Sequence, residues 1–316
     1  MLPSARPLVG LTLLTLLTQH ASAAVAPRLP TVPTVEISPG VNMPLLNFGF
    51  QKNHTDAITV GVRGLDTAKI YGDPQQSEVG RAVRSAVASG LVTRSDLFVT
   101  TKVPCCPAKQ FVGAVKGELI CVSPQAKNTT HDIEHDFDEL GLDYVDLMLV
   151  HWPCDDMADS VRTYLALEPL LKSGRARAIG VSNFNASALQ ALLPQVNVKP
   201  AVNQCGYSIA GHSEDLWGRD DATRDASRAA GIHYSAYSPL GGWAKGGTSH
   251  VLSDPTVNAV ARAHNVSAAQ VALRWVVQQG VIAVTSSDKI EHVRSDLEIF
   301  QFQLTDDEMD RLAKVV

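Results

Sequence analysis

The chain has 316 residues, of which 45% are hydrophobic and 19% are charged, as is usual for a globular protein with a sizeable core. Its formal net charge is -5 and its lysines and arginines form no run, which argues against nucleic acid and acidic membranes as partners. The length fits one large α/β domain or two ordinary domains.

The N-terminus has the features of a secretory signal peptide. Arg6 precedes an apolar stretch over residues 8–17, and the small residues at 21–23 (ASA) match the pattern that signal peptidase cleaves. The stretch is too short to cross a bilayer, which takes about 20 residues, and no later segment suits a transmembrane helix. We predict a signal peptide over residues 1–23 and a proline-rich linker over 24–34. A disordered or membrane-contacting N-terminus is the alternative.

Secretory entry would bring the protein to the endoplasmic reticulum lumen, the cell exterior or, by the secretory route, a plastid. Four N-glycosylation sequons agree mildly with this prediction, and they begin at Asn53, Asn128, Asn185 and Asn265. Of the five cysteines, at positions 105, 106, 121, 154 and 205, an odd one must stay free or pair between chains. Their spacing matches no zinc pattern, and no cluster of His, Asp and Glu has metal-ligand spacing, so we expect no metal site.

After the linker, extended and helical patterns alternate along the chain. Residues 34–48 contain two short extended runs about Pro39-Gly40, which predicts a β-hairpin. Eight apolar, β-branched runs occur at residues 45–50, 64–68, 97–103, 144–151, 176–183, 200–204, 233–239 and 281–287. Amphipathic segments lie between them at residues 77–90, 159–174, 188–195, 220–231 and 255–280. Thr305 and Glu308 form a capping box before a last helix.

This repeated pattern predicts a (β/α)8 TIM barrel with an N-terminal β-hairpin, over residues 35–316. A doubly wound sheet is the alternative, but no G-x-G-x-x-G motif follows the first strand.

Polar side chains follow the predicted strands where barrel enzymes keep their catalytic groups. Any one of them is more often part of an ion pair or a hydrogen-bonded rim, but several should converge on one mouth. In chain order they are Asp66 with Tyr71 just beyond, Lys102, His151, Asn183, Gln204 and Ser238.

These residues suit the reduction of a carbonyl group. A phenol has a pKa near 10, and an adjacent ammonium favours the phenolate and lowers that pKa. Tyr71 would then be the acid, Lys102 its activator, and Asp66 the anchor of Lys102. His151 would orient a carbonyl oxygen while a bound nicotinamide supplies hydride.

The chain resembles the aldo-keto reductase family from about Val35 to its end. The matching motifs are GVRGLDTAKIY, TTKV, LGLDYVDLMLVHWP, GRARAIGVSNF, PAVNQ and YSAYSPLGG. The resemblance implies that Asp66, Tyr71, Lys102 and His151 are catalytic. It also implies that NADPH, or NADH in its place, is bound by Ser182, Asn183, Gln204, Tyr237, Ser238, Leu240, Ser286, Ser287, His292 and Asp296.

The cofactor's phosphate site departs from the family pattern. Family members usually have a cation at the position of His292, where neutral histidine pairs weakly with a 2'-phosphate. Lys289 and Arg294 are nearby, but helical spacing places them on other faces. Asp296 replaces an expected asparagine and cannot donate a hydrogen bond when it is ionised.

The family resemblance also predicts the surroundings of the substrate. Only six residues separate Gly49 from the helical pattern DAITVG, so the first barrel helix should be short. The long C-terminal loop of many relatives has no counterpart before Val316, so we expect an open pocket lined by Phe50 and Trp152.

The cysteines that follow strand ends should crowd the mouth of the barrel. They are Cys105, Cys106, Cys154 and Cys205. We predict one disulfide between the pair 105/106 and either Cys154 or Cys121; the alternative is that all are unpaired.

Two functions remain open on the sequence alone. The first is an NAD(P)H-dependent reductase of small aldehydes or ketones, of the alcohol dehydrogenase (NADP+) type, and a monomer as relatives commonly are. The alternative is a barrel that binds nicotinamide nucleotide with little or no turnover, as a sensor or partner subunit.

Overall fold

The computed structural model describes residues 31–49, 53–106, 128–214, 218–242 and 247–315. The predicted signal peptide, Phe50 and Cys121 therefore lie outside the described residues, and the predictions for them stay predictions.

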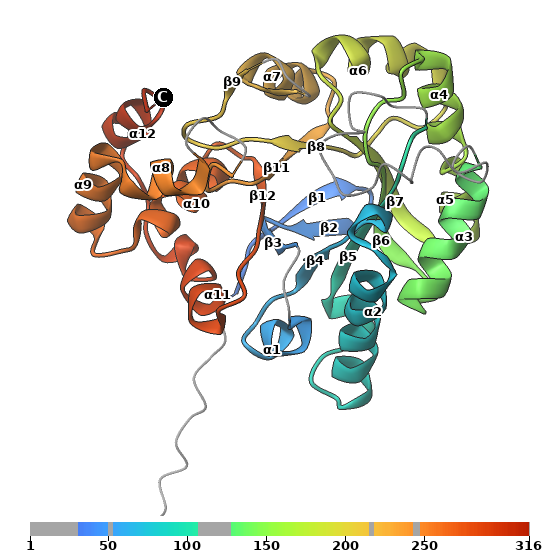
Figure 1. Cartoon of the computed structure of the whole chain (residues 1–316), viewed down its shortest axis with the longest axis horizontal. Coiled ribbons are helices and arrows are strands. Elements are labelled where there is room, and N and C mark those ends of the chain that lie inside the picture. Colours follow the sequence, from blue (N-terminus) through green and yellow to red (C-terminus); the bar gives the residue numbers. More distant parts are fainter. Residues whose placement is uncertain (1–30, 50–52, 107–127, 215–217, 243–246, 316) are drawn as a thin grey trace, which may run out of the picture.

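A closed barrel of parallel strands forms the centre of the molecule, and helices surround it (Figure 1). Neighbouring strands pair in the order β11-β12-β3-β4-β5-β6-β7-β8. The barrel strands are β3 Leu46–Phe48, β4 Gly64–Asp66, β5 Phe98–Val103, β6 Val145–Val150, β7 Ala176–Ser182, β8 Val202–Gly206, β11 His233–Tyr237 and β12 Ile282–Thr285. Seven of them lie within predicted runs and β8 extends two residues beyond its run, so the predicted TIM barrel is confirmed.

Helices form at each of the predicted amphipathic segments and also at other places in the chain, and side chains cap many of the helix N-termini. The α-helices are α1 His54–Thr59, α2 Asp73–Ala88, α3 Thr129–Leu140, α4 Met157–Leu165, α5 Glu168–Ser173, α6 Ala186–Leu192, α7 Asp221–Ala229, α8 Gly247–Ser253, α9 Pro255–His264, α10 Ala268–Gln278, α11 Ile290–Asp296 and α12 Asp306–Leu312. Short 3-10 turns are η1 Lys69–Tyr71, η2 Arg94–Asp96, η5 Leu193–Gln195 and η6 Ile299–Gln301. The predicted capping box of Thr305 and Glu308 begins α12, and α1 has only six residues, as expected.

Two of the predicted helices are divided. Residues 159–174 form α4 and α5, because Pro169 occupies the first turn of α5 and cannot continue a preceding helix. Residues 255–280 form α9 and α10, because Asn265 is left-handed (φ 54°) and Ser267 starts a new capping box.

The N-terminal hairpin lies across one end of the barrel (Figure 1). Its strands β1 Thr34–Ser38 and β2 Val41–Pro44 are antiparallel. Side chains of the hairpin pack against barrel side chains in one apolar cluster. It contains Ile37, Val41, Met43, Phe98, Leu147, Leu149, Ala178, Val202 and Ile282. This apolar cluster fills one end of the barrel, which leaves the opposite end, where the strands terminate, for polar side chains. The short strands β9 Ser213–Glu214 and β10 Arg219–Asp220 pair outside the barrel.

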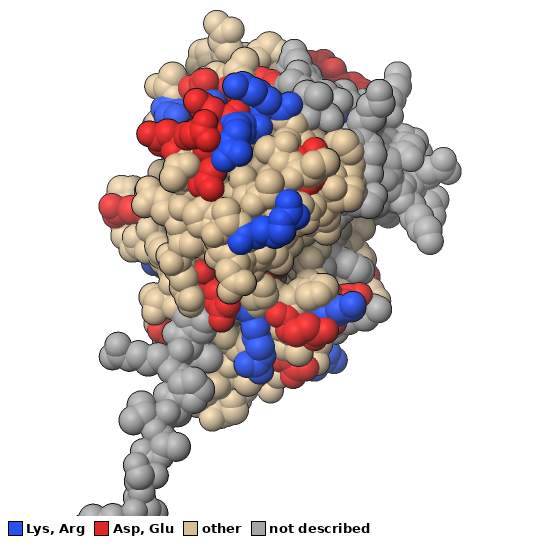
Figure 2. Space-filling model, turned by 90° about the vertical axis from the view of Figure 1, so that its left-hand side faces the viewer, with Lys and Arg blue, Asp and Glu red and all other residues tan. Residues whose placement is uncertain are grey.

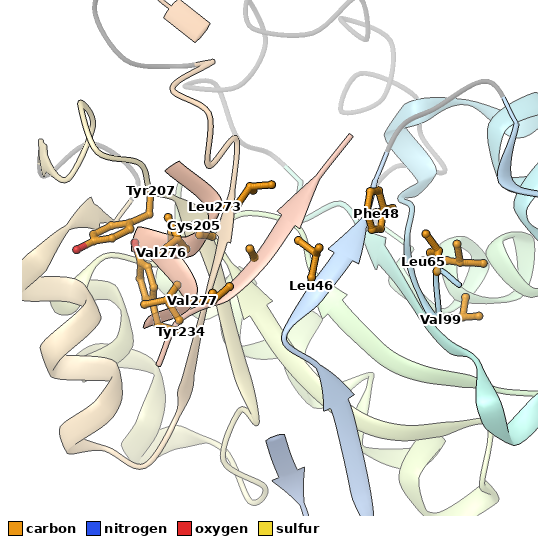
Figure 3. Packing of buried hydrophobic residues seen from close by; sticks show 14 of the residues in the cluster. Leu46, Phe48, Leu65, Val99, Cys205, Tyr207, Tyr234, Leu273, Val276 and Val277 are labelled. Carbon is orange, nitrogen blue, oxygen red and sulfur yellow. The ribbon is translucent and has the colours of Figure 1, made fainter. Parts of the chain in front are cut away.

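Apolar side chains on the outer surface of the strands pack against the helices. Leu65 and Val99 face each other across neighbouring strands, and Leu273 and Val276 of α10 join the same core (Figure 3). Cys205 lies in this core with Tyr207 and Tyr234. The prediction that Cys205 crowds the mouth is therefore wrong, because strand alternation turns it outward from its neighbour Gln204.

The surface carries charges of both signs. On the face turned to the viewer in Figure 2, on the side of α9 and α12 in Figure 1, acidic and basic side chains lie next to one another. None of the described helices combines the length and the hydrophobicity needed to span a bilayer.

A buried polar triad joins the barrel to α2 and α3. Gln76 Nε2 donates to Asp136 Oδ1 (2.7 Å), and Thr101 Oγ1 lies 3.0 Å from Gln76 Oε1 and 3.2 Å from Asp136 Oδ2. The single hydroxyl proton of Thr101 can serve only one of these oxygens, so a proton on Asp136 completes the set. Burial raises the pKa of Asp136 to about 8, in agreement with a neutral carboxyl group.

We expect Asp136→Asn to reduce the pH dependence of stability. A carboxyl group whose pKa is raised in the folded state binds more protons there than in the unfolded state, so it makes stability fall as pH rises from about 4 to about 8. Over the middle of that range the slope is about 1.4 kcal/mol per pH unit. Denaturant unfolding at several pH values should show this slope in the wild type and in the exposed control Asp138→Asn, but not in Asp136→Asn. An unchanged slope in Asp136→Asn would refute the assignment.

Candidate active site

Strand alternation brings the predicted polar residues together at one end of the barrel. Phe98 of β5 and Leu147 of β6 belong to the interior cluster, so the residues four further along, Lys102 and His151, have the same inward parity. Ser182 lies four residues after Ala178, and Gln204 lies two residues after Val202. These two side chains therefore also point into the barrel. The interior is thus apolar at the hairpin end and polar where the strands end.

Lys102 and Asp66 form a buried ion pair at the centre of this site. Lys102 is 0% exposed and Asp66 is 3% exposed. The Lys102 ammonium donates to Asp66 Oδ1 and to the carbonyl oxygen of Thr67, the latter at 3.0 Å. Burial lowers the pKa of Lys102, but the charges of Asp66 and then Tyr71 outweigh it, so the pKa lies above its usual value. Lys102 is therefore an ammonium at neutral pH.

Tyr71 lies above this pair, on the turn η1 after β4. The Lys102 Nζ atom is 5.4 Å from the centre of the Tyr71 ring. Tyr71 is 37% exposed as a whole residue, yet burial around its hydroxyl raises its pKa above the usual value, while Lys102 acts in the opposite direction. Lys102 lowers the pKa of Tyr71, as predicted. The prediction of a net lowering is wrong, because burial of the phenolate raises the pKa by more than Lys102 lowers it. The phenol thus keeps its proton at neutral pH.

His151 follows β6 directly and faces Tyr71. The two rings lie edge to face with their centres 6.0 Å apart. Burial, and then the charge of Lys102, lower the pKa of His151 well below its usual value, so the imidazole is neutral. Its Nδ1 atom is buried and has no hydrogen-bond partner in the part of the chain that the structure describes. A neutral imidazole beside a phenol can orient an oxygen atom without competing with Tyr71 for its proton.

The predicted nicotinamide-binding residues form a hydrogen-bonded group beside the four predicted catalytic residues. Asn183 Nδ2 donates to the carbonyl oxygen of His151, and Tyr237 donates from its hydroxyl to Asn183 Oδ1, both at 2.8 Å. Ser182 Oγ donates to the backbone carbonyl of Gln204 (2.6 Å), and Gln204 Nε2 donates to Asp66 Oδ2 (2.8 Å). Gln204 therefore also holds the carboxylate that anchors the lysine, a contact that the sequence did not indicate.

Backbone strain marks this edge of the barrel. Asn183 and Ser238 have positive φ values, 63° and 52°, which are uncommon for residues other than glycine. Such conformations occur preferentially at functional sites, where the surrounding structure holds them. Both residues directly follow inward-facing strand ends, and Leu240 lies half-buried just beyond Ser238.

The predicted phosphate-binding residues lie after β12 and on α11. Ser286 and His292 are exposed, and Ser287 Oγ lies 3.4 Å from His292 Nδ1. Asp296, in contrast, is only 4% exposed, and burial raises its pKa to about 7. Near neutral pH its carboxyl group is partly protonated. The protonated form is able to donate a hydrogen bond, whereas the ionised form is not.

A disulfide joins the segments that follow β5 and β6. Cys105 lies three residues beyond Lys102, and Cys154 lies three residues beyond His151. The two cysteines form this bond, with 5.0 Å between their Cα atoms. This is one of the predicted alternatives, and Cys106 is also disulfide-bonded. Trp152 is buried, donates its indole N–H to the Cys105 carbonyl (2.7 Å), and has its ring 4.7 Å from that of His151. Trp152 is thus fixed beside His151.

Two contacts of the site had no signal in the sequence, because only the folded chain brings their groups together. The Thr67 carbonyl contacts Lys102 through the backbone, which leaves no residue-type signal. The link from Gln204 to Asp66 joins residues 138 positions apart and depends on the closure of the barrel.

Known proteins resemble this chain in sequence and in structure. A sequence model of the Aldo/keto reductase family matches residues 52–316. The chain is 34% identical over 293 residues to morphine 6-dehydrogenase of Pseudomonas putida. This match covers 88% of this chain and 89% of that protein. It is 32% identical over 288 residues to glyoxal reductase of Bacillus subtilis (strain 168), and this match covers 88% of this chain and 91% of that protein.

Solved structures give the same result. An aldo/keto reductase from Brucella melitensis has a TM-score of 0.74 and 29% identity, and the match covers 90% of this chain and 100% of that one. A Bombyx mori aldo-keto reductase in complex with NADP has a TM-score of 0.73 and 26% identity, and the match covers 90% of this chain and 92% of that one.

Proposed function

Because this chain belongs to the aldo/keto reductase family, we propose that it reduces aldehydes or ketones to alcohols, with Tyr71 as the proton donor and NADPH as the hydride source. The activity would be of the alcohol dehydrogenase (NADP+) type. The observation that carries this proposal is the buried Lys102 ammonium, which contacts Asp66 on one side and Tyr71 on the other.

The electrostatics of the four side chains favour transfer of a proton from Tyr71 to a carbonyl oxygen. Tyr71 is protonated at neutral pH, and the phenolate that remains after transfer would lie next to the Lys102 ammonium. Asp66 holds that ammonium in place, and Gln204 and Lys102 satisfy both oxygens of Asp66. Neutral His151 would orient the carbonyl oxygen toward Tyr71.

The residues beside this site fit a nicotinamide nucleotide. Amide and hydroxyl groups of Ser182, Asn183 and Gln204 line the edge of the barrel next to His151, and the aromatic ring of Tyr237 is held there by its bond to Asn183. When bound, the nicotinamide supplies the hydride. The complex of the Bombyx mori relative with NADP supports the same cofactor class for this chain.

We expect weak discrimination between NADPH and NADH. Exposed His292 pairs poorly with a 2'-phosphate when neutral, whereas an arginine offers a charge-assisted, two-pronged contact worth about 1.5–3 kcal/mol. His292→Arg should therefore tighten NADPH binding by about tenfold or more and leave NADH binding nearly unchanged. Fluorescence titration with both nucleotides measures this. Equal tightening of both nucleotides, or of neither, would show that His292 does not face the 2'-phosphate.

The function itself is tested by nucleotide oxidation with the wild-type chain. A panel of small aldehydes and ketones should oxidise NADPH, and the product should be the matching alcohol. Tight nucleotide binding without turnover on any member of the panel would favour the alternative, a nucleotide-binding barrel that acts as a sensor or partner subunit. The carbonyl substrate is expected to be small and the protein to be a monomer.

We also propose that the protein folds in the secretory pathway. Disulfides persist in oxidising compartments and are rare in the cytosol, and Cys105, Cys106 and Cys154 are all disulfide-bonded. Three of the four sequon asparagines are exposed, and all four lie at helix ends, Asn53, Asn128 and Asn185 as N-caps and Asn265 as a C-cap. A glycosidase-sensitive mass shift of the protein from its native cells would support this route, and an unglycosylated, fully reduced protein would contradict it.

A further inference from the structure

A cluster of potential metal ligands lies between α2 and α3, outside the reductase site. His135 and Glu139 are one turn apart on α3, and Asp73 from the first turn of α2 faces them. One ligand atom from each residue lies within 4.8 Å of the others. No such cluster was expected from the sequence, because Asp73 is remote from α3 in the chain.

The contacts within this cluster leave its ligand atoms available. His135 Nδ1 is buried and has no hydrogen-bond partner among the described residues. Its Nε2 atom is 3.7 Å from Asp73 Oδ2, too far for a hydrogen bond. Glu139 accepts a hydrogen bond from Ser77 (2.5 Å). In the described part of the chain, neither Asp73 nor Glu139 forms an ion pair with a lysine or arginine.

Among the described residues, the neighbouring charges do not compensate these two carboxylates. Lys69 pairs with Asp132, 3.3 Å away, and Asp136 is held near neutral by burial. The imidazole of His135 therefore lies beside two carboxylates that no described lysine or arginine neutralises.

We propose that Asp73, His135 and Glu139 bind a divalent transition-metal ion of the zinc class, with water completing the coordination. One imidazole with carboxylates suits Zn²⁺, whereas Mg²⁺ and Ca²⁺ prefer oxygen ligands alone. Zinc–ligand distances are about 2.0–2.2 Å, so the side chains must approach one another slightly. Asp73 is 58% exposed and His135 is 31% exposed, so both have room to adjust.

Such an ion would act on the turn that carries Tyr71. Asp73 is two residues beyond Tyr71, and polar contacts from Lys69, Gln76 and Ser77 already join this segment to α3. A shared ion would add a link between the start of α2 and α3. Its role would be to position this turn, because no ligand of the ion belongs to the four residues of the reductase site.

The test is zinc binding by the full-length protein, measured by calorimetry with zinc chloride and magnesium chloride. The wild type should bind one Zn²⁺ and prefer it to Mg²⁺, and saturating Zn²⁺ should raise Tm by about 3 °C or more. His135→Ala and Glu139→Gln should each weaken zinc binding at least about tenfold. Asp138→Asn is the matched control, since it removes an exposed carboxylate from the same helix, and it should bind Zn²⁺ as the wild type does.

The proposal is overturned if the wild type shows no zinc binding below about 1 mM, or if Asp138→Asn weakens it as much as Glu139→Gln does. If His135→Ala fails to fold, the exposed Asp73→Asn replaces it with the same expected loss. These results do not depend on carbonyl reduction, so the zinc site and the reductase activity can fail separately.

Discussion

Tyr71→Phe should lower kcat for carbonyl reduction by about 10²–10⁴, the usual contribution of a positioned acid, and leave NADPH binding within about twofold of wild type. Phenylalanine keeps the ring that lies over Lys102 and edge-on to His151, and removes only the hydroxyl. The loss should be similar at pH 6 and pH 8. Over that range Tyr71 stays protonated and His151 stays neutral, because burial raises the first pKa and lowers the second.

A tyrosine outside the mouth provides the control for this experiment. Tyr144 precedes β6 at the hairpin end of the barrel, where its ring contacts Arg94. Tyr144→Phe should retain the wild-type rate. A Tyr71→Phe protein that reduces aldehydes at the wild-type rate would show that the proton comes from another group.

Removal of the Cys105–Cys154 disulfide should cost about 4 kcal/mol of unfolding free energy. The bond closes a loop with a sequence separation of 49, and the chain-entropy model gives a loss of that size for such a loop. The double variant Cys105→Ser, Cys154→Ser avoids a lone thiol, and guanidinium unfolding would measure the change. The bond also joins the chain just after Lys102 and His151, so we expect a fall in kcat together with the lower stability.

Cys205→Ala is the control for the loss of buried sulfur. Cys205 is free and fully buried, and burial raises its pKa to about 12, so it is an inert core residue. Its substitution should cost only about 1 kcal/mol and leave kcat unchanged. If the double variant unfolds at the same denaturant concentration as the wild type, the disulfide does not constrain the unfolded chain as proposed.

Strand and helix periodicity made most of the fold predictable. Each barrel strand overlaps a predicted apolar run, because parallel strands buried on both faces produce continuous apolar segments. Local chemistry was equally informative at Thr305, where a capping box depends on residues only three apart. The breaks before α5 and α10 had local signals in Pro169 and Asn265, but the amphipathic pattern continued across both.

The site was predictable in its members and less so in its energetics. Strand ends and family motifs identified Asp66, Lys102 and His151 together with Tyr71, and the structure brings these side chains together. The net direction of the Tyr71 pKa shift depends on burial at its hydroxyl, which no sequence pattern reports.

Longer-range groupings were out of reach of local patterns for a different reason. The bond from Gln204 to Asp66 and the approach of Asp73 to α3 join segments that are distant in sequence, so only barrel closure and helix packing create them. The side of the strand on which Cys205 lies followed from alternation alone and was open to prediction.

The central claim is that Tyr71, held beside an anchored ammonium, delivers a proton to a carbonyl oxygen that His151 orients. A crystal structure of the protein with NADP+ and a carbonyl-bearing inhibitor tests it most directly. The account predicts that the inhibitor's carbonyl oxygen lies within about 3.2 Å of both the Tyr71 hydroxyl and a His151 ring nitrogen. A carbonyl oxygen bound elsewhere, with the Tyr71 hydroxyl directed away from Lys102, would contradict it.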